Sequence, residues 1–100
     1  MGKAITKKQI EELQNKQVTL KLVDIRSSRE YEKLHVPDVI NIPSEELKNK
    51  LGEFAKDDIL VCICNHGKER SQQAAELLYN AGFENTFYLE AGTAGWYEAH

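Results

Sequence analysis

A cysteine at the end of an apolar stretch is the residue of this sequence best placed to do chemistry. Cys64 follows the apolar residues 59–63, and a short polar loop with one glycine leads from it to Arg70, where a helical pattern begins. Such a loop directs backbone N–H groups toward one point, and the helix N-terminus adds positive potential there. A thiolate at that point is stabilised, and the thiolate is the reactive form of cysteine. We therefore expect Cys64 to be a nucleophile, although a free cysteine is more often a small buried core residue.

Charged side chains in the loop bear on which molecules the thiol would meet. Arg70 is expected to bind an anion or a substrate, because a cation at a helix N-terminus is otherwise mildly unfavourable. His66 and Lys68 are expected at the rim, where they either attract anions and lower the thiol pKa or have no specific role. Glu69 opposes these cations by its charge and is expected to pair with a neighbouring group.

Length and charge limit the classes of protein to consider. The chain has 100 residues and a formal net charge of -3, so we expect a single domain over residues 1–100 that folds without disulfides or metal. The charge gives no electrostatic reason to expect binding to nucleic acid or to a membrane. The sequence shows neither an apolar run of membrane-spanning length nor the apolar segment of a signal peptide, which favours a cytoplasmic protein.

The second cysteine, Cys62, precedes Cys64 by two residues in an expected strand. The two side chains then share a face but are too far apart for a ready disulfide. The pair is also a weak metal signal without further ligands nearby, so we expect no metal site. Reduced thiols fit a reducing compartment. Cys62 is interpreted as a strand-interior residue, with a role as a resolving thiol for Cys64 as the alternative.

Hydrophobic patterning predicts strands that alternate with helices. Capping-box spacing at Thr6–Gln9 and Ser27–Glu30 indicates two helix starts. Strands are expected at residues 18–25, 39–42, 59–64 and 86–89, and helices at 6–15, 27–34, 44–51 and from 70 to 81, with a helical turn around Trp96. Nearly continuous apolar strands between helices predict an α/β domain whose parallel sheet is covered on both faces. Ligands bind beyond the carboxyl ends of the strands in such sheets, where Cys64 is expected.

Several segments, taken in order, resemble the rhodanese family. Asp24-x-Arg26 followed by Glu30-Tyr31 is similar to that family's D-x-R-x-x-x-E-[YF] signature. The further matches, in family order, are His35-Val36-Pro37, Ile40-Asn41-Ile42-Pro43, the Cys64 loop, Ser71, Ala74-Ala75, Leu78, Gly82-Phe83, Tyr88-Leu89, Gly92 and Trp96. The resemblance covers nearly the whole chain. It implies a rhodanese-like parallel sheet of about five strands with helices on both faces.

The resemblance also implies a sulfurtransferase that needs no cofactor. Rhodaneses move sulfane sulfur through a persulfide on the loop cysteine, which by position is Cys64. The donor would be thiosulfate, polysulfide or a protein persulfide, the acceptor a thiol or cyanide, and the partners would include a sulfur-donor or sulfur-acceptor protein. The backbone N–H groups that would hold the transferred sulfur belong to Asn65, His66, Gly67, Lys68, Glu69 and Arg70.

The loop is one residue longer than the common rhodanese C-x-x-G-x-R-S. The spacing Cys64-x5-Arg70 resembles rhodanese-fold phosphatases of the cell-cycle type and the related arsenate reductases, in which arginine bridges two oxygens of a tetrahedral oxyanion. Two alternatives to sulfur transfer therefore stay open: a phosphatase or arsenate reductase, and a non-catalytic sulfur-carrier or regulatory module. Leu34, Asp38 and Ala91 also stand where the family has glycine.

Five other side chains are expected to be structural. Asp24 and Arg26 are interpreted as an ion pair, and His35 as a hydrogen-bonded histidine rather than a base. Trp96 and Phe83 are expected in the core, since large aromatic side chains contribute most of their energy there.

Overall fold

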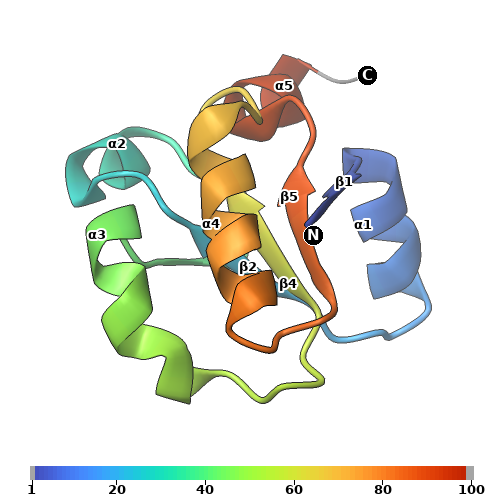
Figure 1. Ribbon diagram of the computed structural model, residues 1–100. Coiled ribbons are helices and arrows are strands. Elements are labelled where there is room, and N and C mark those ends of the chain that lie inside the picture. Colours follow the sequence, from blue (N-terminus) through green and yellow to red (C-terminus); the bar gives the residue numbers. More distant parts are fainter. Residues whose placement is uncertain (1, 99–100) are drawn as a thin grey trace.

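A five-stranded parallel sheet forms the centre of the protein (Figure 1). The computed structural model describes residues 2–98. The strands are β1 (Lys3–Ile5), β2 (Lys21–Asp24), β3 (Val39–Asn41), β4 (Leu60–Ile63) and β5 (Thr86–Leu89). Their order across the sheet is β1-β5-β4-β2-β3, and every pairing is parallel. The strand that ends just before Cys64, β4, therefore lies in the middle of the sheet.

Helices cover both faces of the sheet, as the sequence predicts (Figure 1). They are α1 (Lys7–Asn15), α2 (Ser28–Lys33), α3 (Ser44–Leu47), the 3-10 helix η1 (Lys48–Glu53), α4 (Glu69–Asn80) and α5 (Gly92–Glu98). One buried cluster joins Cys62 of β4 to Leu47 of α3 and Leu78 of α4. The cluster on the other face joins Val61 of β4 to Ile10 of α1.

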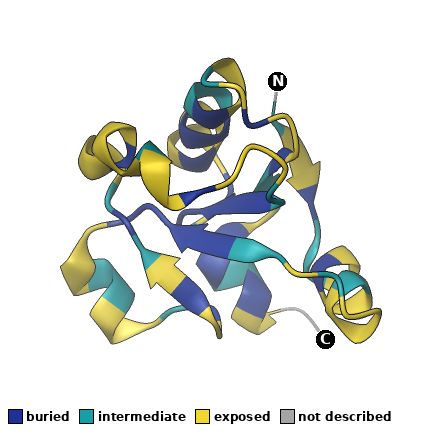
Figure 2. Ribbon diagram, turned by 90° about the horizontal axis from the view of Figure 1, so that it is seen from below, coloured by how far each residue is buried: buried dark blue, intermediate teal, exposed yellow. Residues whose placement is uncertain are grey.

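The middle strand supplies both clusters, because successive side chains of a strand point to opposite faces. All four residues of β4 are buried. Figure 2 shows such buried strands enclosed by helices whose outer sides are exposed. The Cys64 loop therefore starts from the most firmly enclosed part of the fold.

Both predicted capping boxes are present. Thr6 Oγ1 accepts a hydrogen bond from Gln9 N at 3.1 Å, and Gln9 Oε1 accepts one from Thr6 N at 2.9 Å. Ser27 and Glu30 make the same pair of bonds at the start of α2, at 3.2 and 3.1 Å. These bonds satisfy N–H groups that a helix start leaves free. They fix where α1 and α2 begin and hold Glu30 in the first turn of α2.

Three elements differ from the prediction. Strand β1 was not predicted, because a three-residue edge strand with one buried side chain carries no periodic pattern. The start of β2 was predicted at residue 18, whereas the strand begins at Lys21, after a turn in which Gln17 has a φ of 63°. The helix expected at 44–51 is α-helical only to Leu47 and continues as η1 through Gly52 to Glu53. Such 3-10 turns are frequent at the ends of α-helices.

The histidine and the two aromatic residues that were expected to be structural make internal contacts or are buried. His35 Nδ1 lies 2.8 Å from the carbonyl oxygen of Tyr31, and the two rings stack. Trp96 and Phe83 are buried. Within residues 2–98, the structure contains no helix that is both long enough and apolar enough to cross a membrane.

Candidate active site

The loop after β4 borders a pocket at the carboxyl ends of the strands. Cys64 directly follows β4 and is 3% exposed, and α4 begins at Glu69. The pocket has a volume of about 370 Å³ and is lined by Cys64, Asn65, His66, Lys68, Glu69 and Arg70. These are the predicted site residues apart from Gly67, which shapes the loop backbone instead.

The surroundings of the Cys64 sulfur favour its thiolate form. Burial by itself raises the pKa of this thiol, but the Ser71 hydroxyl and the backbone N–H groups of Ser71, Lys68 and His66 outweigh it, so the pKa of Cys64 is lowered. A thiol with a lowered pKa is deprotonated more fully at neutral pH and is available as a nucleophile.

The Ser71 hydroxyl can serve both protonation states of the thiol. Its oxygen lies 3.2 Å from Cys64 Sγ and accepts a hydrogen bond from the thiol S–H. The hydroxyl in turn donates a hydrogen bond to the carbonyl oxygen of Lys68 at 3.3 Å. A hydroxyl hydrogen rotates to suit its partners. When the sulfur is a thiolate, the same hydroxyl can turn and donate to it.

The start of α5 holds the loop in an orientation that directs amides at the sulfur. The N–H groups of Thr93 and Ala94 donate to the carbonyl oxygens of Cys64 and Asn65, at 2.9 and 3.0 Å. The carbonyl and N–H of a trans peptide point in opposite directions. Because the Asn65 carbonyl faces α5, the N–H of His66 faces the sulfur, where it helps to lower the thiol pKa.

Two glycines make this close contact possible. Gly67 has a φ of 67°, and a Cβ atom there would lie 2.5 Å from the carbonyl oxygen of Leu89 and 2.7 Å from the nitrogen of Ala91. Gly92 has a φ of 61°, and its Cβ would collide with the carbonyl oxygen of Cys64. Positive φ values and such distances are readily accommodated only by glycine.

The positions that depart from family glycines do not disturb the fold. Asp38 and Ala91 take up the left-handed conformation that glycine would favour, with φ values of 66° and 68°. Leu34 is extended, with a φ of -166°, and needs no glycine. Aspartate tolerates the left-handed region better than alanine does, so Ala91 holds the more strained backbone of the two.

Arg70 does not face the sulfur in this structure. Its guanidinium pairs with the carboxylate of Glu30 on α2, with Nη2 to Oε1 at 3.2 Å and Nη1 to Oε2 at 3.4 Å. The Arg70 hydrogen bonds hold the pKa of Glu30 at about 2, with help from Ser27 and Asn65 and against a smaller opposing effect of burial. The predicted anion-binding cation therefore has an internal carboxylate as its partner.

A buried ion pair supports the first residue of the loop. Arg26 and Asp24 are 4% and 0% exposed, and Arg26 Nη2 lies 2.7 Å from Asp24 Oδ2, as expected for a structural pair. Arg26 Nη1 also donates to Asn65 Oδ1 at 2.8 Å, and Asn65 Nδ2 donates to Glu30 Oε2 at 3.0 Å. The segment that carries Asp24, Arg26 and Glu30 thus braces both ends of the loop, at Asn65 and at Arg70.

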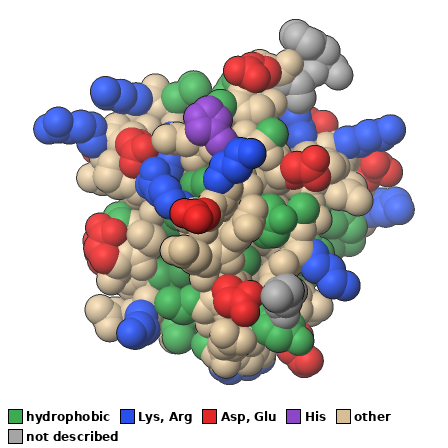
Figure 3. All heavy atoms as spheres, turned by 45° about the horizontal axis from the view of Figure 1, so that its top comes forward, with side chains coloured by type: hydrophobic (Ala, Val, Ile, Leu, Met, Phe, Trp, Pro, Cys, Tyr) green, Lys and Arg blue, Asp and Glu red, His purple; other side chains and the backbone are tan. Residues whose placement is uncertain are grey.

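The remaining charged residues of the loop lie at its surface. His66, Lys68 and Glu69 are exposed, and His66 and Lys68 lower the thiol pKa through their backbone N–H groups rather than through side-chain charge. Figure 3 shows side chains of both signs gathered with a histidine on the face that carries the strand ends. Glu69 makes no ion pair within residues 2–98, contrary to expectation. Its charge instead complements the N-terminus of α4.

Cys62 is inaccessible to solvent. It is 0% exposed in the interior of β4, in the same buried cluster as Cys64. Burial, with a smaller contribution from the nearby Cys64, raises the pKa of Cys62 to about 12. It therefore stays a thiol at neutral pH, which fits the interpretation as a strand-interior residue and not the resolving-thiol alternative.

Two residues that contact the loop or the sulfur were absent from the predicted site. Ser71 is 0% exposed although it is polar, and its place on the buried face of α4 beside Ala74 and Ala75 was the available signal. Glu30 was assigned to the capping box and to the family signature but not to the site, and its contact with Arg70 joins residues 40 positions apart. Sequence spacing could reveal the first of these residues but not the second.

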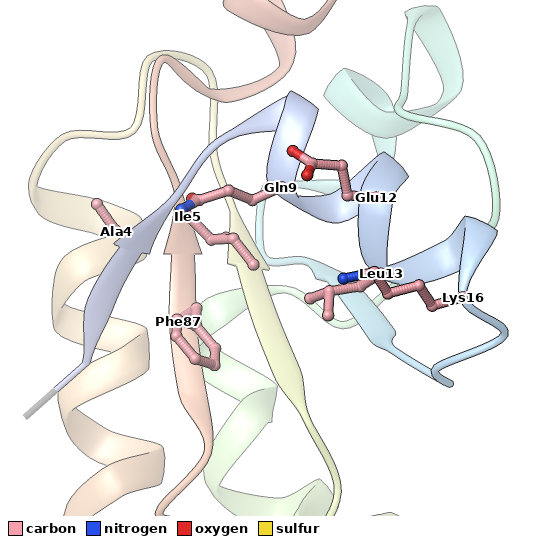
Figure 4. Close-up of a pocket in the computed structure, with 7 residues that line it drawn as sticks. All are labelled: Ala4, Ile5, Gln9, Glu12, Leu13, Lys16 and Phe87. Carbon is pink, nitrogen blue, oxygen red and sulfur yellow. The ribbon is translucent and has the colours of Figure 1, made fainter.

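A second pocket lies away from this chemistry. It has a volume of about 310 Å³, between α1 and the strands β1 and β5, and Figure 4 shows its lining residues Ala4, Ile5, Gln9, Glu12, Leu13, Lys16 and Phe87. None of these side chains is a nucleophile of the kind that Cys64 provides. The pocket over the Cys64 loop is therefore the candidate active site.

The fold and the site together define a class: a small α/β domain with a cysteine of lowered pKa in the loop after its central strand. The family model described as "Rhodanese-like domain" matches residues 6–99. The chain belongs to this family, which confirms the resemblance read from the sequence.

Relatives in the family differ in how much of their length the chain spans. Thiosulfate sulfurtransferase GlpE of Shewanella oneidensis is 33% identical over 82 residues, which are 82% of this chain and 80% of that protein. Putative sulfur carrier protein YrkF of Bacillus subtilis is 33% identical over 78 residues, which are 78% of this chain but 42% of that protein. The human single-domain sulfurtransferase TSTD1 shares the fold, with a TM-score of 0.89 and 23% identity over 100% of this chain and 99% of that one.

Proposed function

We propose that the protein is a sulfurtransferase of the rhodanese type, with Cys64 as the residue that carries the sulfur. The observation that carries the proposal is the set of donors around Cys64 Sγ, namely the Ser71 hydroxyl and the N–H groups of His66, Lys68 and Ser71. Such donors stabilise a negative charge on sulfur. They would act equally on a thiolate and on a persulfide anion at the same place.

The reaction is proposed to proceed in two displacement steps. The Cys64 thiolate attacks the outer sulfur of the donor, so that a new S–S bond forms and the donor's own S–S bond breaks. The bonding electrons leave with sulfite when the donor is thiosulfate, or with a thiolate when it is a persulfide. An acceptor thiolate or cyanide then attacks the outer sulfur of the Cys64 persulfide. The product is a persulfide or thiocyanate, the Cys64 thiolate returns, and neither step needs a cofactor.

The loop is proposed to hold the transferred sulfur between the two steps. This is supported by the pocket over Cys64, which is lined by Asn65, His66, Lys68, Glu69 and Arg70 and has a volume of about 370 Å³. Backbone N–H groups suit this task because they carry no net charge and need no movement at the moment of reaction. Asn65, Gly67, Glu69 and Arg70 would contribute through the shape of this loop as well as through their amides.

The donor and acceptor are proposed to include protein partners. The name of GlpE gives thiosulfate as a donor for that relative, and the name of YrkF describes a carrier of sulfur. The opening over Cys64 is bordered by exposed side chains, so a partner's thiol or persulfide could approach it. Both cysteines of this chain are free, and we propose a reducing compartment, the cytoplasm, as the place of the reaction.

The oxyanion alternative is less favoured by the position of Arg70. A phosphatase or arsenate reductase would need this guanidinium to face a tetrahedral anion above Cys64, whereas it pairs with Glu30. The loop length alone supports that alternative. A non-catalytic carrier would use the same Cys64 persulfide, so only turnover separates it from an enzyme.

The proposal is tested by assaying wild type and Cys64→Ser with thiosulfate plus cyanide and, separately, with an aryl phosphate. We expect thiocyanate formation by the wild type, its loss in Cys64→Ser, and no phosphate release by either. Phosphate release without sulfur transfer would overturn the proposal. A Cys64 persulfide that forms without turnover of either substrate would assign the protein as a carrier instead.

A further inference from the structure

Arg70 is one of the basic residues that line the pocket over the sulfur, and it is paired with Glu30. Arg70 is the last residue of the Cys64-x5-Arg70 spacing and lines the pocket over the sulfur. Both of its terminal nitrogens are engaged by the two carboxylate oxygens of Glu30. A tetrahedral dianion above Cys64 would need the same two nitrogens, because guanidinium binds such groups with paired N–H donors.

Glu30 is held in place by more than Arg70. Its Oε1 accepts hydrogen bonds from Ser27 N and Ser27 Oγ, both at 3.1 Å, and its Oε2 accepts one from Asn65 Nδ2 at 3.0 Å. Asn65 is in turn fixed by Arg26 at 2.8 Å. The carboxylate is therefore anchored to α2 and to the loop, and it would remain at the rim if Arg70 turned away.

The rim as a whole carries no net formal charge. Glu30 and Glu69 are acidic, Lys68 and Arg70 are basic, and His66 is neutral at pH 7. A dianion that drew Arg70 from Glu30 would leave the Glu30 carboxylate unpaired and close to its own negative charge. Like charges at close range repel one another, more strongly where water is partly excluded.

We propose that Glu30 is a specificity-determining residue that keeps Arg70 from the sulfur pocket and so selects against tetrahedral dianions. Phosphate and arsenate are disfavoured, and the free dianion thiosulfate is a weaker donor than a sulfane sulfur borne on a thiol. This inference rests on the proposed function in taking Cys64 as the reacting atom. It explains how a loop of oxyanion-binding length can serve sulfur transfer.

The inference is tested by measuring how well inorganic phosphate protects Cys64 from alkylation by iodoacetamide. This readout needs no sulfur transfer, so a failure of the proposed function leaves it intact. Cys62 is buried and does not compete for the reagent. Glu30→Gln removes the carboxylate charge but keeps a residue that completes a capping box.

We expect the phosphate concentration that gives half-protection to fall about tenfold in Glu30→Gln. The freed Arg70 would then donate charge-assisted hydrogen bonds to the phosphate, which would account for a gain of this size. The gain should vanish in the double variant Glu30→Gln/Arg70→Gln. Glu32→Gln, which removes a charge from an exposed site on the same helix, should leave protection within twofold of wild type. No gain in folded Glu30→Gln, or an equal gain in Glu32→Gln or in the double variant, would overturn the inference.

Arg70→Gln provides a second test that does not depend on the folding of Glu30→Gln. Because Arg70 is engaged by Glu30, its removal should weaken phosphate protection less than fivefold. A larger loss would show that Arg70 already binds the anion in the wild type, and would overturn the inference.

Discussion

Cys64 Sγ and Ser71 Oγ lie 3.2 Å apart, the first at the end of the central strand and the second in the first turn of α4. Both are almost fully buried, at 3% and 0% exposure. The contact joins the two elements that carry the loop, so the fold itself sets the distance between nucleophile and hydroxyl. It also provides a side-chain donor for the thiolate, beside the donors from the backbone.

Removing that hydroxyl should make Cys64 less reactive. In Ser71→Ala the thiolate loses a donor that lowers its pKa. The pH profile of alkylation by iodoacetamide should therefore move to higher pH, and the rate at neutral pH should fall about tenfold, the usual effect of one hydrogen bond to a charged group. Ser28→Ala, at an exposed position of α2, is the control. An unchanged profile in Ser71→Ala would contradict the role assigned to the hydroxyl.

Gly67 should tolerate no side chain. Gly67→Ala places a Cβ atom 2.5 Å from the Leu89 carbonyl at a φ of 67°, so the loop must move, and we expect a loss of at least about 2 kcal/mol in the free energy of unfolding. Urea denaturation measures it. Gly52→Ala is the matched control, because its Cβ would meet nothing within 4 Å. Equal stability of the two variants would show that the loop is not constrained as described.

How far the sequence predicted this fold depended on local signals. The two capping boxes and the apolar β4 were readable because each pattern lies within a few neighbouring residues. The edge strand β1 was not predicted because its three residues are recognisable as a strand only from their pairing with β5. The change from α3 to η1 at Leu47 likewise corresponds to no local pattern in the sequence.

In the site, too, local patterns could be predicted from the sequence and contacts between distant residues could not. The position of Cys64 and the loop around it could be predicted from the strand, loop and helix order. The partner of Arg70 could not, because Glu30 is brought to it by the packing of α2 beside the loop. The contacts of Thr93 with the loop backbone were equally hidden, since hydrogen bonds between main-chain atoms leave no trace in side-chain types.

The acid stability of the protein should depend on Glu30. Its folded pKa is about 2, below the ordinary value of 4.5, so its contribution is fully present above about pH 4.5 and is lost as the pH falls toward 2. The pair is about half exposed, which limits its value to about 1 kcal/mol in water. Glu30→Gln should therefore lower the free energy of unfolding at pH 7 by about that amount and by less near pH 2.5.

Urea denaturation at both pH values measures this difference, with Glu32→Gln as the variant of equal charge. A loss in Glu30→Gln that is the same at pH 7 and pH 2.5 would mean that the carboxylate is not stabilised by Arg70 in solution. Added salt should reduce the difference, since the pair is exposed to screening.

Cys62 should be dispensable for chemistry. It is 0% exposed, and the pKa of its thiol is raised to about 12, so Cys62→Ala should change the rate of sulfur transfer less than twofold. The variant should lose about 1 kcal/mol of stability, because it leaves a small cavity beneath the loop. Kinetics at a temperature well below the unfolding midpoint separate the two effects. A large loss of activity there would restore the resolving-thiol alternative.

The role of Cys64 as the sulfur carrier is tested by the intact mass of the protein after incubation with excess thiosulfate and removal of small molecules. We expect the wild type to gain the mass of one sulfur atom, cyanide to remove that atom with release of thiocyanate, and Cys64→Ser to gain nothing. Peptide mapping should place the added sulfur on Cys64. Thiocyanate formation that persists in Cys64→Ser, or sulfur found on another residue, would contradict sulfur transfer through Cys64.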